Sequence, residues 1–281
     1  MVDSFFYSLR RTANRYGVMP ALRTTRLILL FGPWRPAVRW LIRLARPPQY
    51  QEVSEGDIAI INADDQMILA KKIRKNSAAR IGKVTDSLLR DIRSITNRLP
   101  VDHYQQVHQV DPNIKRLVDD PGLKNLLRRY FAAEPVMLEC TLMITSNEKA
   151  AQANRPIKYH YDYATWDFLN MFVYLTDVED RSAYHEVVER SHGRKKFSDL
   201  FGEPNILENE AIRRFGTRMR HLKGKAGTIY MENSEAFHRR KPSTQRRVML
   251  NVIYASCPDF LSNGRVYVSN LNNRDTEYAK L

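Results

Sequence analysis

Cysteine is scarce in this chain of 281 residues, which contains only Cys140 and Cys257. Both lie in or beside apolar segments that resemble strands, so we expect two buried thiols rather than a disulfide. This cysteine usage disfavours a secreted, disulfide-stapled protein. It fits a reducing compartment, and we expect the cytoplasm.

Long hydrophobic runs are missing near the start of the chain. The apolar run at 27–31 is far shorter than the roughly 20 residues that a membrane-spanning helix needs. The longer apolar core and small-residue cleavage site of a secretory signal are also missing. We find no internal repeat, low-complexity run or long linker. With 43% apolar residues, the chain can build a sizeable core, and its length allows one large domain with an extension.

Acidic residues are nearly absent from the first fifty positions, which hold nine arginines, no lysine and one acid, Asp3. Nine minus one gives +8, more than half of the net charge of +14 for the whole chain. Such charge bears on partners rather than on fold. We find no nucleic-acid-binding motif and expect no nucleic-acid partner.

The segment 35–46 has the pattern of a short basic amphipathic helix. Its arginines recur on one side, and most of its apolar residues lie on the other: Arg35, Arg39, Arg43 and Arg46 against Val38, Leu41, Ile42 and Ala45. One interpretation packs the apolar side on the core and leaves the arginines in water. The other is peripheral contact of residues 35–46 with an anionic membrane.

Coarse periodicity divides the remaining chain into a helix-rich half and a strand-rich half. Residues 64–99 read as mostly helical, with a break allowed at Gly82, and 121–131 as a further helix. Strands are expected at 58–61, 135–145, 168–175, 227–231 and 247–254. We therefore predict a mainly β fold, a double-stranded β-helix (jelly roll, cupin-like) at about 135–257 with flanking α-helices. The expected division is a basic, helical extension at 1–50 followed by a single domain at 51–281.

A metal-ligand pattern centres on His160 and Asp162. On a strand, residues two apart point to the same face, so both side chains can bind one ion while Tyr161 faces away. His238, which follows the strand at 227–231, can supply a third ligand from another strand. Two histidines and one carboxylate leave about three positions open, which is the arrangement of non-haem Fe(II) oxygenases. A single His-x-Asp pair is more often a surface hydrogen bond, so the surrounding order of segments matters.

That order resembles the phytanoyl-CoA dioxygenase-like family of Fe(II)/2-oxoglutarate-dependent oxygenases. The resemblance covers roughly residues 130–257 and rests on the metal pattern, the strand into 174–178, the turn at 190–192, the strand at 227–228 and the later arginine. Where many relatives have Gly before Ser-His, this chain has Arg190, and Ala183-Tyr184 stands in place of Gly-Pro. These departures lie outside the metal set and bear on substrate more than on chemistry.

The far carboxylate of 2-oxoglutarate needs a cation, and arginine matches a carboxylate with two parallel hydrogen bonds. Both Arg246 and Arg247 compete for this role. Period-two alternation groups Arg247 with Asn251, whereas Arg246 falls on an all-apolar face, so we favour Arg247. Asn170 is a weaker candidate for the co-substrate pocket. His185 and His192 are not expected to be ligands, although His185 lies in a probable strand and is a candidate for the cavity wall.

The resemblance implies oxidative decarboxylation of 2-oxoglutarate to succinate and CO₂ with O₂, coupled to hydroxylation of a small-molecule substrate. Halogenases of the family lack the carboxylate ligand, whereas Asp162 is present here. Basic residues flanking the motifs favour an anionic substrate: Arg194, Lys195, Lys196, Arg239, Arg240 and Lys241. A lipid-linked substrate stays open. The alternative is a basic membrane- or polyanion-binding protein on an oxygenase scaffold whose site has lapsed.

Overall fold

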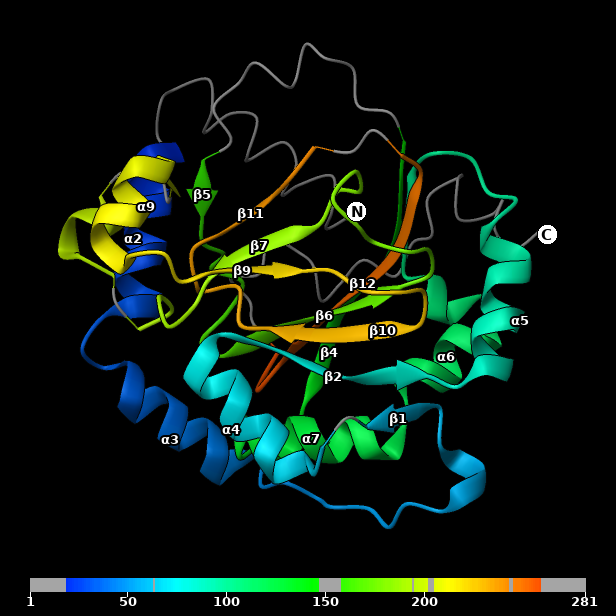
Figure 1. The fold of residues 1–281 in the computed structure, drawn as a ribbon. Coiled ribbons are helices and arrows are strands. Elements are labelled where there is room, and N and C mark those ends of the chain that lie inside the picture. Colours follow the sequence, from blue (N-terminus) through cyan, green and yellow to red (C-terminus); the bar gives the residue numbers. More distant parts are fainter. Residues whose placement is uncertain are drawn as a thin grey trace.

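Two antiparallel sheets pack against each other in the computed structural model, which describes residues 19–62, 64–146, 158–193, 195–201, 205–242 and 245–258, with backbone alone for 19–22. Within these residues the larger sheet has the strand order β1-β2-β10-β6-β12-β4-β3 and the smaller one β8-β5-β11-β7-β9 (Figure 1). The larger sheet consists of β1 (Ile60–Asn62), β2 (Ala78–Val84), β10 (Thr228–Glu232), β6 (Phe168–Tyr174), β12 (Arg247–Ala255), β4 (Val136–Thr145) and β3 (His103–Gln105). The smaller sheet consists of β8 (Asn205–Ile206), β5 (Tyr159–His160), β11 (His238–Arg240), β7 (His185–Val188) and β9 (Met219–Leu222).

Helices cover the outer face of the larger sheet. They are α4 (Gln66–Asn76), α5 (Asp86–Thr96), α6 (Pro112–Val118) and α7 (Pro121–Phe131). Leu69 of α4 and Leu126 of α7 share one buried apolar cluster with Leu250 and Val252 of β12. The alternate residues of β6 and β12 point to the other face, toward the smaller sheet. One face of the larger sheet is therefore covered by helices, and the other face is available to line a binding site.

Helices α2 (Met19–Phe31) and α9 (Glu208–Phe215) lie beside the smaller sheet, where Leu27 and Phe215 pack with Tyr159 and Phe237. Short 3₁₀ turns occur at η1 (Glu55–Asp57), η2 (Val107–Gln109) and η3 (Phe197–Leu200). The described chain is thus mixed α and β rather than mainly β. Within the described ranges, no helix is long and apolar enough to cross a membrane.

Local signals explain the helix that was predicted best. Helix α7 begins after Asp120, whose side chain accepts a hydrogen bond from Leu123 N, and Pro121 occupies its first position. An aspartate cap followed by proline is a strong start signal, because it satisfies free N–H groups and fixes the backbone angle. Ala132 ends the helix with a left-handed backbone, at φ 53°. The strands predicted at 135–145, 168–175, 227–231 and 247–254 are also present as β4, β6, β10 and β12.

The helix predicted over 64–99 is wrong in its middle. Ser77 ends α4 with a positive φ of 69°, and residues 78–84 then form β2, which pairs with β1 and β10. Gly82 is needed in this strand because a Cβ there would lie 2.2 Å from the Ile61 carbonyl oxygen of β1. Strands β1, β2 and β3 come from residues before 135, so the larger sheet extends beyond the predicted core at about 135–257.

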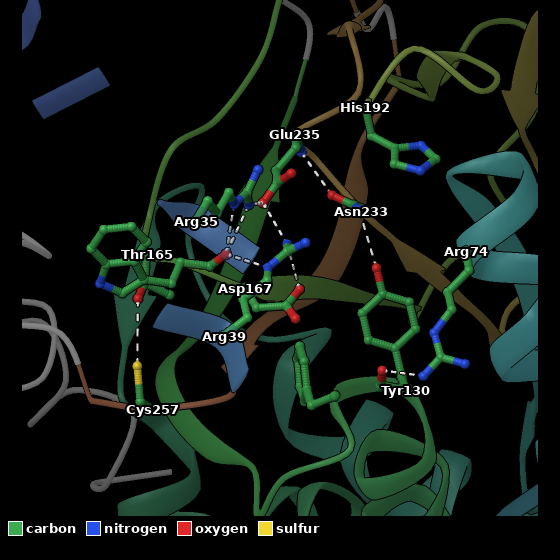
Figure 2. Close-up of polar contacts among 12 residues, drawn as sticks. Arg35, Arg39, Arg74, Tyr130, Thr165, Asp167, His192, Asn233, Glu235 and Cys257 are labelled. Carbon is green, nitrogen blue, oxygen red and sulfur yellow. Dashed lines mark hydrogen bonds and ion pairs between the residues drawn. The ribbon is translucent and has the colours of Figure 1, made fainter. Parts of the chain in front are cut away.

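Helix α3 (Arg35–Ala45) binds the rest of the chain through its arginines, opposite to the expected orientation. Figure 2 shows Arg35 and Arg39 reaching Glu235 and Asp167. Both arginines also donate to the Trp166 carbonyl, at 2.8 Å and 3.0 Å. Further along, Arg43 donates to Phe131 O and Arg46 donates to Glu134 O. We call these four arginines with their partners the arginine latch.

Three large apolar residues of α3 point the other way: Trp40, Leu41 and Leu44. Leu41 and Leu44 are 56% and 60% exposed, whereas Ile42 packs against the core. The arginines face the core because carbonyl and carboxylate oxygens there need hydrogen-bond donors. One guanidinium offers five N–H groups. The arginine stems meanwhile cover apolar surface. The first eighteen residues of the predicted extension, with Arg10, Arg11 and Arg15, lie outside the described residues.

Candidate metal and co-substrate site

A cavity of about 770 Å³ opens between the two sheets. The smaller sheet and the segment after β5 contribute His160, Asp162, His185, His238 and Arg240. His103 comes from β3, at the edge of the larger sheet. The larger sheet contributes residues from β4, β6 and β12: Met143, Thr145, Asn170, Phe172, Arg247, Met249 and Asn251. The size is within the range of small-molecule sites, about 300–1,000 Å³.

Three side chains predicted as ligands meet in this cavity. Ligand atoms of His160, Asp162 and His238 all lie within 4.8 Å of one another. His160 on β5 is directly paired with His238 on β11. Asp162 follows β5, and its backbone N–H donates to Ser234 O at 2.8 Å, which holds the carboxylate beside the two rings. Backbone pairing thus places all three donors around one point, and this two-histidine, one-carboxylate set fits a divalent iron ion.

The tautomer of His238 is fixed by its backbone neighbour. Its Nδ1 lies 2.9 Å from Ala236 O, and a carbonyl oxygen only accepts, so Nδ1 carries the proton. The lone pair of the neutral ring is then on Nε2, the atom 3.8 Å from Asp162 Oδ2. Metal-binding histidines are commonly oriented by such a bond from the second ring nitrogen.

The surroundings shift the pKa values of the two histidines in opposite directions. Burial and then the neighbouring His238 lower the pKa of His160 to about 4. Burial also acts to lower the pKa of His238, but the carboxylates of Glu232 and Asp162 outweigh it and raise that pKa above its ordinary value. His160 is therefore neutral and available as a ligand near neutral pH.

Glu232 is a neighbour of the site that the sequence did not reveal. Its carboxylate is fully buried, with Oε2 3.4 Å from His185 Nδ1 and Oε1 3.6 Å from His238 Nδ1. One feature of the sequence could have indicated it: Glu232 is an acid at the end of an otherwise apolar strand. Burying a carboxylate without partners is costly, so such a residue is expected to have partners. His185 lines the cavity and is not among the three converging ligands. His192 instead bonds Ser77 Oγ through Nδ1, at 2.7 Å.

The structure separates the two competing arginines. Arg247 lines the cavity and is buried beside the Ala183 carbonyl, which accepts a hydrogen bond from it. Arg246 points to the helix-covered side, where Nη2 donates to Leu99 O at 2.7 Å after α5 ends. Met249 and Asn251 share the cavity face with Arg247, as strand alternation requires.

Unsatisfied acceptors mark the part of the cavity near β12. The side-chain oxygens of Thr145, Asn170 and Asn251 are buried and have no hydrogen-bond partner among the described residues. Thr145 is paired directly with Arg247 across β4 and β12. Buried polar atoms are normally hydrogen-bonded, so orphaned ones in a cavity indicate a place for water or a polar ligand.

Much of the positive charge that suggested an anionic substrate is already neutralised. Arg239 forms ion pairs with Glu186 and Glu208, both at 2.8 Å, and Lys241 lies 3.5 Å from Glu186. Lys195 packs between the rings of Phe31 and Tyr161. Among the six basic residues in that set, Arg240 lines the cavity, and Arg194 lies outside the described residues.

No protein-family model matches the chain, and no curated protein matches it. Solved structures do. EctD from S. alaskensis, with 2-oxoglutarate and 5-hydroxyectoine, aligns at a TM-score of 0.54 with 16% identity, covering 75% of this chain and 82% of its own. The non-haem alpha-ketoglutarate-dependent epimerase SnoN from nogalamycin biosynthesis aligns at 0.54 with 13% identity, covering 68% and 82%. This chain has the fold of these enzymes.

HygX from Streptomyces hygroscopicus extends the likeness to structures that hold metal. Its iron-bound form aligns at a TM-score of 0.52 with 14% identity, covering 70% of this chain and 88% of that one. A second HygX structure holds nickel and 2-oxoglutarate, at the same TM-score of 0.52. At such identities the likeness concerns the fold alone.

Proposed function

We propose that this protein is a non-haem Fe(II)- and 2-oxoglutarate-dependent dioxygenase that hydroxylates a small-molecule substrate. The observation that carries the proposal is the convergence of His160, Asp162 and His238 within 4.8 Å, in a cavity that also contains Arg247. A metal site and a carboxylate anchor in one cavity are what this chemistry requires.

Each residue has a separate task in the proposal. His160, Asp162 and His238 hold iron and leave positions open for the co-substrate and O₂. Arg247 binds the far carboxylate of 2-oxoglutarate with its planar fork, and Asn170 hydrogen-bonds the same molecule. Bound iron would supply the oxidative decarboxylation of 2-oxoglutarate to succinate and CO₂, coupled to hydroxylation of a C–H bond.

The chain's own groups prepare this site. Ala236 O keeps the His238 proton on Nδ1. The helix-backed larger sheet supplies a rigid wall, and Phe172, Met143 and Met249 make part of the cavity apolar. An apolar wall excludes water from the reacting atoms and strengthens electrostatic contacts to the co-substrate.

The substrate class is inferred from the cavity lining. Met143 and Phe172 offer apolar contact, while His103, His185 and Arg240 offer polar and basic contact. We infer a small molecule with an apolar part and an anionic or hydrogen-bonding group. The order of the motifs supports a phytanoyl-CoA dioxygenase-like member, and the two facing sheets support a double-stranded β-helix, with activity expected in the cytoplasm.

The alternative is a lapsed oxygenase scaffold with a binding role only. A lapsed site tends to lose ligands or its carboxylate anchor, whereas all three ligands and Arg247 are present here. This disfavours the alternative.

A two-part experiment tests the proposal. The purified protein is loaded with Fe(II) under anaerobic conditions and its iron content is measured. It is then mixed with O₂ and 2-oxoglutarate, and succinate is quantified. We expect about one iron per chain and succinate release that requires both iron and 2-oxoglutarate. A protein that binds neither iron nor 2-oxoglutarate would overturn the proposal in favour of the binding scaffold.

A further inference from the structure

Helix α3 has an exposed apolar surface on the side opposite to the arginines that bond it to the rest of the protein. Trp40, Leu41 and Leu44 are 58%, 56% and 60% exposed, and Trp34 is exposed just before the helix. We call these four residues the α3 apolar face. Large exposed hydrophobic groups gathered on one short helix are unusual in a monomer and mark an interaction site.

The face belongs to a wider concentration of exposed apolar residues. Of the fifteen large hydrophobic side chains that are exposed among the described residues, ten lie within residues 29–68. They are Leu29, Trp34, Trp40, Leu41, Leu44, Tyr50, Val53, Ile61, Met67 and Ile68. This stretch is less than one-fifth of the described residues, so its share is far above an even distribution along the sequence.

Basic residues lie on α4, a helix that contacts the same end of α7 as α3 does. Arg43 of α3 bonds Phe131 O, and Arg74 of α4 bonds Arg129 O and Tyr130 O, so both helices meet the same end of α7. Figure 1 shows α3 and α4 on the same side of the molecule. Helix α4 also exposes Lys71 and Lys75. An apolar face beside a basic surface is complementary to an anionic lipid leaflet.

We propose that the α3 apolar face inserts into the surface of an anionic membrane. Trp40 suits the interfacial layer, because an indole ring has an apolar body and a polar N–H. The N–H of Trp34 already donates to Leu29 O, so Trp34 contributes only its apolar ring. The arginine latch holds the opposite side of the helix on the core, so the helix is already formed and oriented before it meets lipid. Binding therefore avoids most of the ordering cost that a disordered anchor would bear.

This proposal differs from the one drawn from the arginine pattern. In that interpretation Arg35 and Arg39 would have faced the lipid, whereas here they bond Trp166, Asp167 and Glu235. The contact with lipid is made by apolar side chains, and the electrostatic attraction comes from Lys71 and Lys75 of α4. It is independent of the proposed enzyme activity, because vesicle binding is measured without iron, 2-oxoglutarate or substrate.

The test compares two triple variants of the full chain. The first carries Trp40→Gln, Leu41→Gln and Leu44→Gln, which keep good helix propensity. The matched control carries Phe197→Gln, Phe201→Gln and Leu207→Gln, three other exposed apolar residues. Both are sedimented with vesicles of phosphatidylcholine plus phosphatidylglycerol and with phosphatidylcholine alone, and circular dichroism checks that each is folded.

We expect wild type and control to bind the anionic vesicles. The α3 variant should bind at least about tenfold more weakly, because it lacks three apolar side chains that lipid would bury. Lys71→Glu with Lys75→Glu should weaken binding to anionic vesicles as well. In a protein whose only tryptophan is Trp40, lipids brominated in the acyl chain should quench the emission.

Three results would overturn the proposal. The first is an α3 variant that binds anionic vesicles as well as wild type does. The second is equal binding to phosphatidylcholine alone, which removes the anionic requirement. The third is a wild-type protein that does not bind vesicles but forms a dimer by analytical ultracentrifugation, with the dimer lost in the α3 variant. That outcome would assign the face to a second copy of the chain.

Discussion

The sequence pattern predicted the direction of an arginine side chain correctly in one region of this molecule and wrongly in another. Arg247 sits on a strand between two packed layers, and period-two alternation assigned it to the cavity side, where it is found. The arginines of α3 lie on a helix at the surface, and the same kind of pattern reasoning pointed them outward, whereas they face the core. A strand inside a sandwich has two well-defined sides. On a surface helix, an arginine-rich side can face either water or the protein, because the guanidinium groups can donate to protein acceptors.

The largest expected effect concerns the centre of the cavity. Asp162→Ala should abolish iron-dependent succinate release and strongly weaken iron binding, because two histidines alone hold the metal poorly. His185→Ala removes a cavity histidine that is outside the ligand set, and that variant should keep its iron. Metal analysis of both purified proteins checks this pair. Iron lost in His185→Ala and retained in Asp162→Ala would make the ligand assignment wrong.

The arginine latch should show its effect in stability. Arg35→Ala leaves the buried Glu235 carboxylate without its nearest cation, and breaking such a buried pair costs about 3–5 kcal/mol. Arg43→Ala removes one hydrogen bond, to Phe131 O, and should cost only about 0.5–1.5 kcal/mol. Urea denaturation of both variants measures the difference. Equal and small losses would show that α3 contributes little to the folded state.

Asp167 tests the same latch through pH. Burial raises the pKa of Asp167 from 3.8 to about 6, although Arg39 opposes the rise. A carboxyl whose pKa is raised on folding stabilises the folded state fully below pH 3.8, and that stabilisation is lost as the pH rises through about 6. Relative to Asp167→Asn, wild type should lose up to about 3 kcal/mol across this window. A pH-independent difference between the two unfolding free energies would contradict the assignment.

The strand-borne pair gives the most discriminating comparison. Arg247→Ala should weaken 2-oxoglutarate binding by about 1.5–3 kcal/mol, the worth of a charge-assisted contact. Arg246→Ala should leave it nearly unchanged, because Arg246 bonds Leu99 O on the far side of the sheet. Titration of 2-oxoglutarate into the iron-loaded proteins without O₂ measures both. The reverse ranking would assign the anchor to Arg246.

The candidate site was more predictable than the chain around it. His160, Asp162, His238, Arg247 and Asn170 were all placed from spacing, alternation and the family resemblance, and all line one cavity. Their roles as ligands and anchors stay predictions until metal and co-substrate are measured. Long apolar strands such as β6 and β12 were also visible, because one side of each is packed against helices and the pattern persists over many residues.

Other structural features could not be predicted, because no local sequence pattern indicates them. Residues 78–84 mix apolar and basic residues at a spacing that suits a helix or a strand, and only pairing with β1 and β10 decides. Strands β5, β8 and β11 are two or three residues long, too short for a periodic pattern. Glu232 was missed because its partners, His185 and His238, lie 47 and 6 positions away and meet it only in the folded chain.

Glu235 lies on the connection that leads into His238, and it bonds Arg35 across 200 positions of sequence. This single ion pair makes the N-terminal segment a poor candidate for trimming or exchange. A fragment beginning at residue 51 would keep all three candidate ligands yet lose the cation beside Glu235 and the donors to the Trp166 carbonyl. Designers of shortened or chimeric versions should therefore treat α3 and the 233–237 connection as one inseparable part.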